Sequence, residues 1–273
     1  MMKKNILIIG ASSGIGFDLA KALLKQGHTV YCCARRESRL AELEANGAYT
    51  YQVDVRLETN VQNVVQQMVS REGRIDLVYF NAGYAIAGAV EETSVEKVTQ
   101  QFDTNVFGAA RVLRSVLPVL REQQSGRIVL TTSIAARVST GMNAWYSATK
   151  HALNGMAKAL AQEVAQFNID IITVEPGCVN TELPEIQLAD MLNTNELEDY
   201  KLSTQRSHDF LKKAYANGSD TTSTVNVLKK AGFSVNPKQH YRTTVDSKLM
   251  FWLQKIIGEK STGRLFNRLI ALH

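Results

Sequence analysis

The sequence predicts an α/β fold, a Rossmann-type doubly wound parallel sheet with helices on both faces. Strand-like apolar runs alternate with amphipathic stretches along most of the chain, and such alternation implies right-handed crossovers between parallel strands. A glycine-rich turn joins the first strand to the first helix. The length of 273 residues suits one α/β core of ~250 residues. We therefore expect a single domain over residues 1–273.

The predicted strands and helices follow one another in regular order. The strands are short apolar runs of the kind found in a buried parallel sheet, and the helices place apolar residues at helical spacing. The expected strands are NILIIG (5–10), TVYCCA (29–34), AYTYQVDV (48–55), LVYFNAG (77–83), RIVLTTS (127–133) and IDIITVEPG (169–177). The expected helices lie within residues 17–27, 37–47, 60–73, 105–123 and 148–167.

The segment GASSGIG, residues 10–16, is a candidate nucleotide-binding turn. Its pattern is G-x-x-x-G-x-G rather than the commoner G-x-G-x-x-G. Glycines permit a tight turn and let the backbone approach a pyrophosphate, whose charge a helix N-terminus stabilises. Such a turn can also be a plain connection, but its position between a strand and a helix favours cofactor binding. The expected contacts are Gly10, Ser12, Ser13, Gly14, Ile15 and Gly16.

Ser133, Tyr146 and Lys150 form the candidate catalytic group. Lys150 follows Tyr146 by four residues, so on a helix the two side chains share a face. An ammonium beside a phenol favours the phenolate and lowers the tyrosine pKa, which suits proton exchange with an alcohol oxygen near neutral pH. The Ser133 hydroxyl, from another element, could hold the same oxygen. A lone Y-x-x-x-K is more typical of an ordinary surface helix, so the other motifs decide between the two interpretations.

With these motifs the chain resembles the short-chain dehydrogenase/reductase family over about residues 4–181. The resemblance rests on five motifs in order, of which the glycine turn is the first and the Ser/Tyr/Lys group the fourth. The others are Asn81-Ala82-Gly83 after the fourth strand, Asn105, and the Pro176-Gly177 turn with Thr181. Two departures, Ile9 for a common threonine and Phe80 for a common asparagine, concern packing around the cofactor.

The resemblance implies an enzyme that transfers hydride between a nicotinamide cofactor and a carbonyl carbon. In the family the lysine binds the nicotinamide ribose, the serine holds the substrate oxygen and the tyrosine exchanges its proton. The asparagine, which alone is more typical of a helix cap, holds a water in a proton relay, and the threonine anchors the carboxamide. The catalytic residues are then Asn105, Ser133, Tyr146 and Lys150. The implied cofactor contacts are Asn81, Ala82, Gly83, Tyr146, Lys150, Pro176, Gly177, Val179 and Thr181.

The end of the second strand indicates which nicotinamide cofactor is bound. NAD-preferring members of the family carry an acidic residue there, whereas this strand ends in Arg35 and Arg36. A guanidinium can bind a 2′-phosphate bidentately, so we expect NADP(H) to be favoured over NAD(H). The alternative is that both arginines merely begin the next helix on a solvated face. By resemblance, Asp54 and Val55 lie at the adenine position.

Residues 182–225 are expected to form a lid over the substrate. The apolar residues of the lid either line a substrate wall or seal the lid, and we expect sealing for most of Leu183, Ile186, Leu188, Met191 and Leu192. The substrate contacts expected near the chemistry are Ser133, Met142, Trp145 and Tyr146. Such a pocket favours a hydrophobic ketone, aldehyde or alcohol, and the pattern is closest to the hydroxysteroid and retinol dehydrogenase-like branch.

Residues 226–273 are expected to form a basic amphipathic extension. From Lys229 to the C-terminus the chain has nine Lys or Arg and two Asp or Glu, a net charge of +7. The remainder has 22 Lys or Arg and 24 Asp or Glu, a net charge of −2. We expect its two apolar stripes to pack on the domain while the lysines stay solvated. The alternative is contact with an anionic membrane surface. The stripes are Leu249, Trp252, Leu253, Ile256 and Ile257, and then Leu265, Phe266, Leu269 and Ile270.

Composition limits the other classes of function. The five histidines show no metal-ligand spacing, and no recognition motif accompanies the basic charge, so we expect neither a metal nor a nucleic acid. Three cysteines in or beside predicted strands and the lack of long apolar runs favour the cytoplasm. By resemblance, helices at 106–121 and 148–166 form a homodimer or homotetramer. The alternatives are a ketoacyl-carrier reductase and, in another class, a non-catalytic nucleotide-binding or membrane-surface binding protein.

Overall fold

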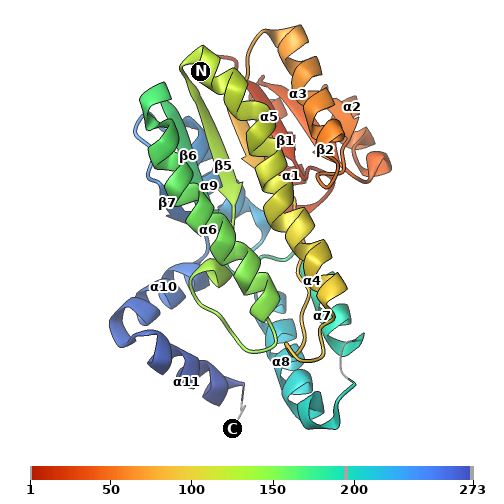
Figure 1. Ribbon diagram of the computed structural model, residues 1–273, viewed down its shortest axis with the longest axis vertical. Helices are drawn as coiled ribbons and strands as arrows, with labels where there is room; N and C mark the ends of the chain where they lie inside the picture. Colours follow the sequence, from red (N-terminus) through yellow and green to blue (C-terminus); the bar gives the residue numbers. More distant parts are fainter. Residues whose placement is uncertain (1, 194–195, 271–273) are drawn as a thin grey trace.

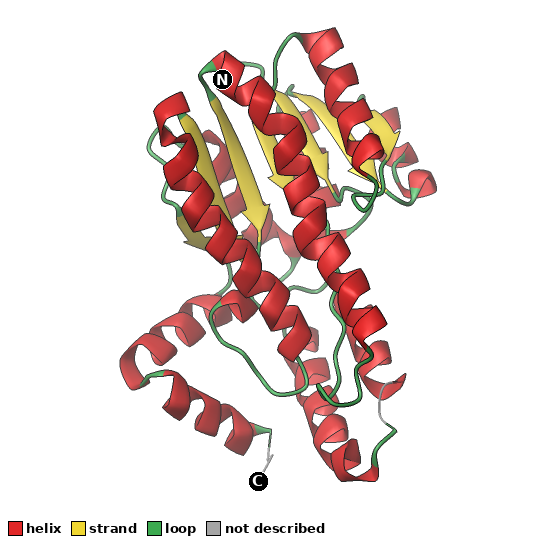
Figure 2. Ribbon diagram, viewed as in Figure 1, coloured by secondary structure: helices red, strands yellow, loops and turns green. Residues whose placement is uncertain are grey.

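The computed structural model describes residues 2–193 and 196–270 and consists of a parallel sheet between two layers of helices (Figures 1 and 2). Within these residues the sheet has seven strands in the order β3-β2-β1-β4-β5-β6-β7, all paired in parallel. The predicted doubly wound sheet is thereby confirmed. The strands are β1 (Asn5–Ile9), β2 (Thr29–Ala34), β3 (Tyr49–Gln52), β4 (Leu77–Phe80), β5 (Gly126–Thr131), β6 (Ile169–Glu175) and β7 (His240–Arg242).

Helices cover both faces of the sheet because each buries one apolar side against it. One buried cluster joins the sheet to α1 (Gly14–Lys25), α2 (Ala41–Ala45) and α9 (Thr221–Phe233). The cluster on the opposite face joins it to α3 (Glu58–Glu72), α5 (Gly108–Gln123) and α6 (Ala144–Val164).

Further helices lie beyond the carboxyl ends of the strands. They are α4 (Val95–Phe102), α7 (Glu182–Asn193), α8 (Glu198–Ala216), α10 (Val245–Ile257) and α11 (Glu259–Leu269). Figure 1 shows α7 and α8 on one side of this end, and α10 and α11 as a bent arm on the other. No helix in the described part of the chain is long and apolar enough to cross a membrane.

The chain returns to the sheet between the lid and the C-terminal arm. The boundary expected at residues 225 and 226 falls inside α9, where Leu228 is fully buried and the helix packs against α1. The sequence does not predict β7, because this edge strand has only three half-buried residues and no apolar run. Its Tyr241 nevertheless pairs with Val174 of β6. Helices α7 and α8, which we call the lid, therefore precede α9, and the C-terminal arm begins after β7.

Candidate active site

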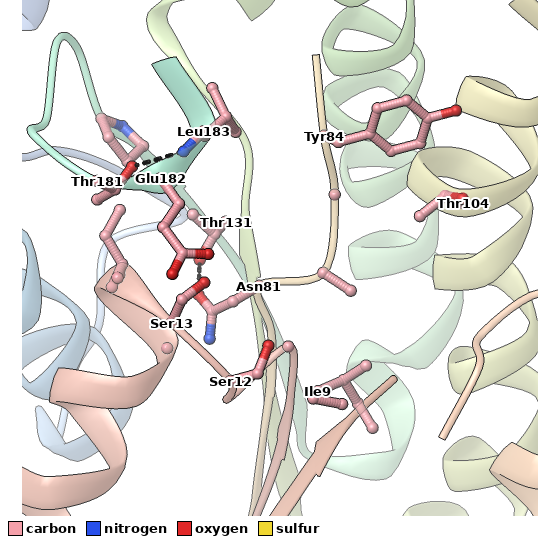
Figure 3. Close-up of a pocket in the computed structure, with 18 of the residues that line it drawn as sticks. Ile9, Ser12, Ser13, Asn81, Tyr84, Thr104, Thr131, Thr181, Glu182 and Leu183 are labelled. Carbon is pink, nitrogen blue, oxygen red and sulfur yellow. Dashed lines mark hydrogen bonds between the residues drawn. The ribbon is translucent and has the colours of Figure 1, made fainter. Parts of the chain in front are cut away.

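A cavity of about 460 Å³ opens at the carboxyl ends of the central strands. Figure 3 shows how residues from separate elements converge on it. Of the residues expected from the sequence, those that line it are Gly10, Ser12, Ser13, Gly14, Ile15, Gly16, Arg35, Arg36, Val55, Asn81, Ala82, Gly83, Ser133, Tyr146, Lys150, Pro176, Gly177, Val179 and Thr181. The fold thus brings four of the five motifs, which are distant in the sequence, to the lining of one cavity.

The glycine turn forms a cradle with little space between backbone segments. Gly10 has φ +88°, and a Cβ there would lie 2.6 Å from the Ala82 nitrogen. A Cβ on Gly16 would lie 2.0 Å from the Gly10 carbonyl oxygen. Only glycine allows this packing, which leaves the turn open to a ligand beside the N-terminus of α1. Asn81, whose Oδ1 accepts a hydrogen bond from the Thr131 hydroxyl, has a buried Nδ2 with no partner among the described residues. The open turn and this donor fit a dinucleotide.

Ser133, Tyr146 and Lys150 meet on one wall of the cavity, and all three are buried. Tyr146 and Lys150 lie one turn apart on α6, and the Lys150 ammonium is 5.6 Å from the centroid of the Tyr146 ring. The ammonium also donates to the Thr131 carbonyl at 3.2 Å. Ser133 follows β5 in an extended conformation, and its Oγ accepts a hydrogen bond from the Ala135 amide at 3.1 Å. The Ser133 hydroxyl can therefore donate its own proton, and the Tyr146 oxygen is one acceptor within reach.

Burial dominates the protonation of this group. It raises the pKa of Tyr146 to about 12, although a hydrogen bond with Ser133 acts in the opposite direction. Burial also lowers the pKa of Lys150 to about 8. The sequence predicts a lowered pKa for Tyr146, and this is wrong for the structure described, because the cost of burying the phenolate exceeds any stabilisation from the ammonium. At neutral pH Tyr146 is protonated, and Lys150 is mostly charged.

Asn105 lies behind the cavity wall rather than on it. It belongs to a π-helical turn, Asp103–Phe107, a distortion that is frequent at functional sites. Its side chain is fully buried. Oδ1 accepts from the Tyr84 amide at 3.0 Å, while Nδ2 donates to the Tyr84 carbonyl at 2.9 Å and to the Thr149 hydroxyl at 3.2 Å. Asn105 therefore fixes the chain just after Gly83, next to Lys150.

The arginine at the cavity mouth is already engaged by a carboxylate. Arg36 donates to the Ser13 hydroxyl at 3.0 Å and to Glu182 at 2.6 Å, and Arg39 lies 3.4 Å from the same carboxylate. Figure 3 shows the Glu182 side chain extending from the start of α7 towards Ser13. No sequence pattern predicts the role of Glu182, since its ion pair with Arg36 joins residues far apart in the chain. Of the adenine-position pair, Val55 lines the cavity, while Asp54 binds Arg56 with both carboxylate oxygens.

Residues of the lid, rather than the expected residues Met142 and Trp145, line the cavity. Met142 and Trp145 are not among the lining residues. Consecutive residues on a helix point about 100° apart, so Trp145 cannot share the direction of Tyr146, and Met142 contacts Thr204 of α8 instead. The lid contributes Leu183, Ile186 and Tyr215 to the lining.

Tyr215 is the lining residue that the sequence analysis overlooks. Its hydroxyl donates to Gln187 at 2.8 Å, and Gln187 in turn donates to Asn143, just before α6, at 3.0 Å. Gln187 is fully buried, so this chain of hydrogen bonds holds the lid against the helix that carries Tyr146.

Comparisons with known proteins show the family to which the chain is similar. The family profile described as short chain dehydrogenase matches residues 4–191. The 3-ketodihydrosphingosine reductase of Bacteroides thetaiotaomicron is 37% identical over 218 residues, which are 80% of this chain and 79% of that protein. A short-chain dehydrogenase from Streptomyces avermitilis has a similar structure, with TM-score 0.82, 28% identity and 98% of each chain covered. ElxO with NADP bound has TM-score 0.72 and 27% identity, with 89% of this chain and 97% of that one covered.

Proposed function

The chain belongs to the short-chain dehydrogenase family and is an oxidoreductase, and from this premise we propose that it interconverts a hydrophobic ketone or aldehyde and its alcohol, using NADP(H) and a Ser-Tyr-Lys-Asn site. One observation carries the proposal. The cavity that contains the glycine cradle is also lined by Ser133, Tyr146 and Lys150, so a bound dinucleotide and the proton-transferring groups would meet in one place.

In the proposed reduction, the chain orients the substrate oxygen and supplies a proton to it. The nicotinamide cofactor, when bound, supplies the hydride. The Ser133 hydroxyl donates to the carbonyl oxygen, and Tyr146 transfers its phenolic proton to the same oxygen. Because burial raises the pKa of Tyr146 to about 12, this proton is retained at neutral pH until it is needed. The charged Lys150 stabilises the phenolate that remains, and oxidation reverses these steps.

The remaining groups hold this arrangement. Asn105 keeps the turn at Gly83 and Tyr84 in place beside Lys150, and by family resemblance it holds the water of a proton relay. The cradle residues and Asn81 would bind the phosphates and riboses of the dinucleotide. Thr181, which lies beside Gly14, would bind the nicotinamide carboxamide.

The proposed preference for NADP(H) rests on Arg36. Its guanidinium lies at the cavity mouth and already binds the Glu182 carboxylate, an anion with hydrogen-bonding geometry like that of phosphate oxygens. ElxO, whose structure holds NADP, supports the same cofactor. Calorimetric titration should give tight binding of NADPH and weak binding of NADH. A preference for NADH would contradict this assignment.

The proposed substrate is a hydrophobic carbonyl compound. The lid adds Leu183, Ile186 and Tyr215, two aliphatic side chains and an aromatic ring, to the cavity lining. The relative named for 3-ketodihydrosphingosine supports a ketone on a long apolar chain. A ketoacyl-carrier reductase is the alternative, and it would turn over carrier-bound ketoacyl thioesters better than free ketones. A homodimer or homotetramer through α5 and α6 remains part of the proposal.

Tyr146→Phe tests the catalytic assignment. The variant should lose turnover of hydrophobic ketones while NADPH affinity stays within a few-fold, because only the transferable proton is removed. Tyr51→Phe, on the edge strand β3 and outside the cavity lining, is the matched control and should keep both properties. Turnover retained in Tyr146→Phe would refute the acid role. NADPH binding without turnover in the unsubstituted protein would favour a non-catalytic nucleotide-binding function.

A further inference from the structure

The first helix of the C-terminal arm, α10, carries an exposed apolar stripe. Val245, Leu249, Trp252 and Ile256 are 78%, 58%, 54% and 77% exposed. Their spacing of four, three and four residues places them on one side of the helix. The expectation that the tail stripes pack on the domain holds for Phe266 of α11 and for Ile270 just after it, which are buried, but is wrong for this stripe.

The opposite side of α10 is fixed to the active site. Thr244, just before the helix, accepts a hydrogen bond from the Gly177 amide at 3.0 Å, and Asp246 accepts one from the Cys178 amide at 2.8 Å. Ser247 is fully buried. Because these contacts set the rotation of the helix, the apolar stripe cannot turn inwards.

Basic side chains flank the stripe. Lys248 and Lys255 are exposed on one border of it, and the Lys255 ammonium lies 5.0 Å from the centroid of the Trp252 ring. Neither lysine forms an ion pair within residues 2–193 and 196–270. The helix α11 adds exposed Lys260, Arg264 and Arg268. An apolar stripe bordered by free cations is the pattern of a helix lying in the interface of an anionic bilayer.

We propose that α10 docks the protein on an anionic membrane surface, with Leu249, Trp252 and Ile256 in the acyl boundary and Lys248 and Lys255 at the headgroups. A second copy of the chain fits this face less well, because a twofold contact would bring the same lysines of both copies together. Four partly exposed side chains also present only a few hundred Å², below the roughly 800 Å² per partner of a standard interface.

Docking would place the active site near the lipid. Figures 1 and 2 show the arm at the same end of the molecule as the lid helices α7 and α8, beyond the carboxyl ends of the strands. If the proposed function holds, a hydrophobic carbonyl compound could then enter from the membrane. The docking itself does not depend on that function and is tested without turnover.

Flotation of the full-length protein with vesicles tests the proposal. Phosphatidylglycerol–phosphatidylcholine vesicles should bind the protein at low salt, and both high salt and vesicles of phosphatidylcholine alone should weaken binding. The double variant Lys248→Gln/Lys255→Gln should bind about 25-fold more weakly, at about five-fold per lysine. Brominated lipids should quench the fluorescence of Trp252, and Trp252→Phe should remove that quenching.

Matched control variants show whether vesicle binding needs the stripe on α10 or any exposed apolar side chain. Leu249→Gln/Ile256→Gln should lose vesicle binding, whereas Leu57→Gln/Leu202→Gln, at residues 54% and 60% exposed elsewhere, should keep it. All variants should retain NADPH binding, which reports on folding. Equal binding to neutral vesicles, or no binding to either kind, would overturn the proposal. So would a dimer that dissociates in Leu249→Gln/Ile256→Gln while vesicle binding is absent, because the face would then bind a second copy.

Discussion

Replacement of Lys150 by methionine is expected to abolish turnover and, at neutral pH, to raise the free energy of unfolding. Burial lowers the pKa of Lys150 from 10.5 to about 8, so the folded protein holds the charge less readily than the unfolded chain. This difference corresponds to a destabilisation of about 3 kcal/mol at pH 7. Methionine removes the charge but also the hydrogen bond to the Thr131 carbonyl, worth about 1–2 kcal/mol. The expected net gain is about 1–2 kcal/mol.

The pH dependence of the free energy of unfolding shows whether the buried charge of Lys150 causes the difference in stability. Because the folded pKa lies below the unfolded one, the unfolded chain binds more protons between about pH 8 and 10.5, and the stability contributed by this group rises with pH over that window. The penalty falls to about 1 kcal/mol at pH 10, so the advantage of Lys150→Met should vanish there. Urea unfolding at pH 7 and pH 10 measures this, with Lys158→Met, an exposed lysine on the same helix, as control. A variant less stable than the parent at pH 7, or an advantage that is equal at both pH values, would refute the reasoning.

Three further predictions concern the cofactor, the proton and the lid. Arg36→Ala should weaken NADPH binding about ten- to a hundred-fold and NADH binding little. Glu182→Gln should tighten NADPH binding a few-fold, because the 2′-phosphate no longer competes with the carboxylate for Arg36. Calorimetry on both variants measures these affinities, and equal effects on the two cofactors would contradict the prediction. Since the pKa of Tyr146 is raised to about 12, kcat/KM for alcohol oxidation should rise about tenfold per pH unit between about pH 5.5 and 7.5, where Lys150 is mostly charged, while that for reduction stays flat. A midpoint near pH 7 in both directions would disprove the dominance of burial. Tyr215→Phe leaves the buried Gln187 oxygen without its donor and should lower the free energy of unfolding by about 1–3 kcal/mol. Urea unfolding measures this, and an unchanged midpoint would contradict the prediction.

Local signals predicted the fold and much of the site. The strands and the glycine turn are contiguous, so their apolar runs and φ requirements can be read directly from residues such as Gly10. Tyr146 and Lys150 were predicted together because helical spacing alone puts them on one face. Asn105 was identified only by family resemblance, since its hydrogen bonds to Tyr84 and Thr149 depend on a π-helical turn that the sequence does not signal.

The missed features are those that depend on contacts between distant elements. Glu182 reaches Arg36 only after the lid has folded over the mouth of the cavity. Tyr215 lines the same cavity as Tyr146 because it lies on the lid, which Gln187 ties to Asn143. The strand β7 is too short and polar to be distinguished from a loop until it is paired with β6. The direction of Met142 depends likewise on its contact with α8 rather than on its distance in sequence from Tyr146.

The start of the C-terminal arm supports a turn that lines the candidate active site, and this determines how the function of the arm can be examined. The Asp246 carboxylate binds the Cys178 amide, and a Cβ on Gly177 would lie 2.0 Å from that carboxylate. Thr244 holds the Gly177 amide, so the Pro-Gly turn that lines the cavity is shaped by residues at the start of α10. Truncation from residue 246 would therefore release this turn and remove the apolar stripe at once. Substitutions confined to the exposed side of α10 leave these hydrogen bonds intact, and only they can distinguish a membrane contact from a damaged cofactor site.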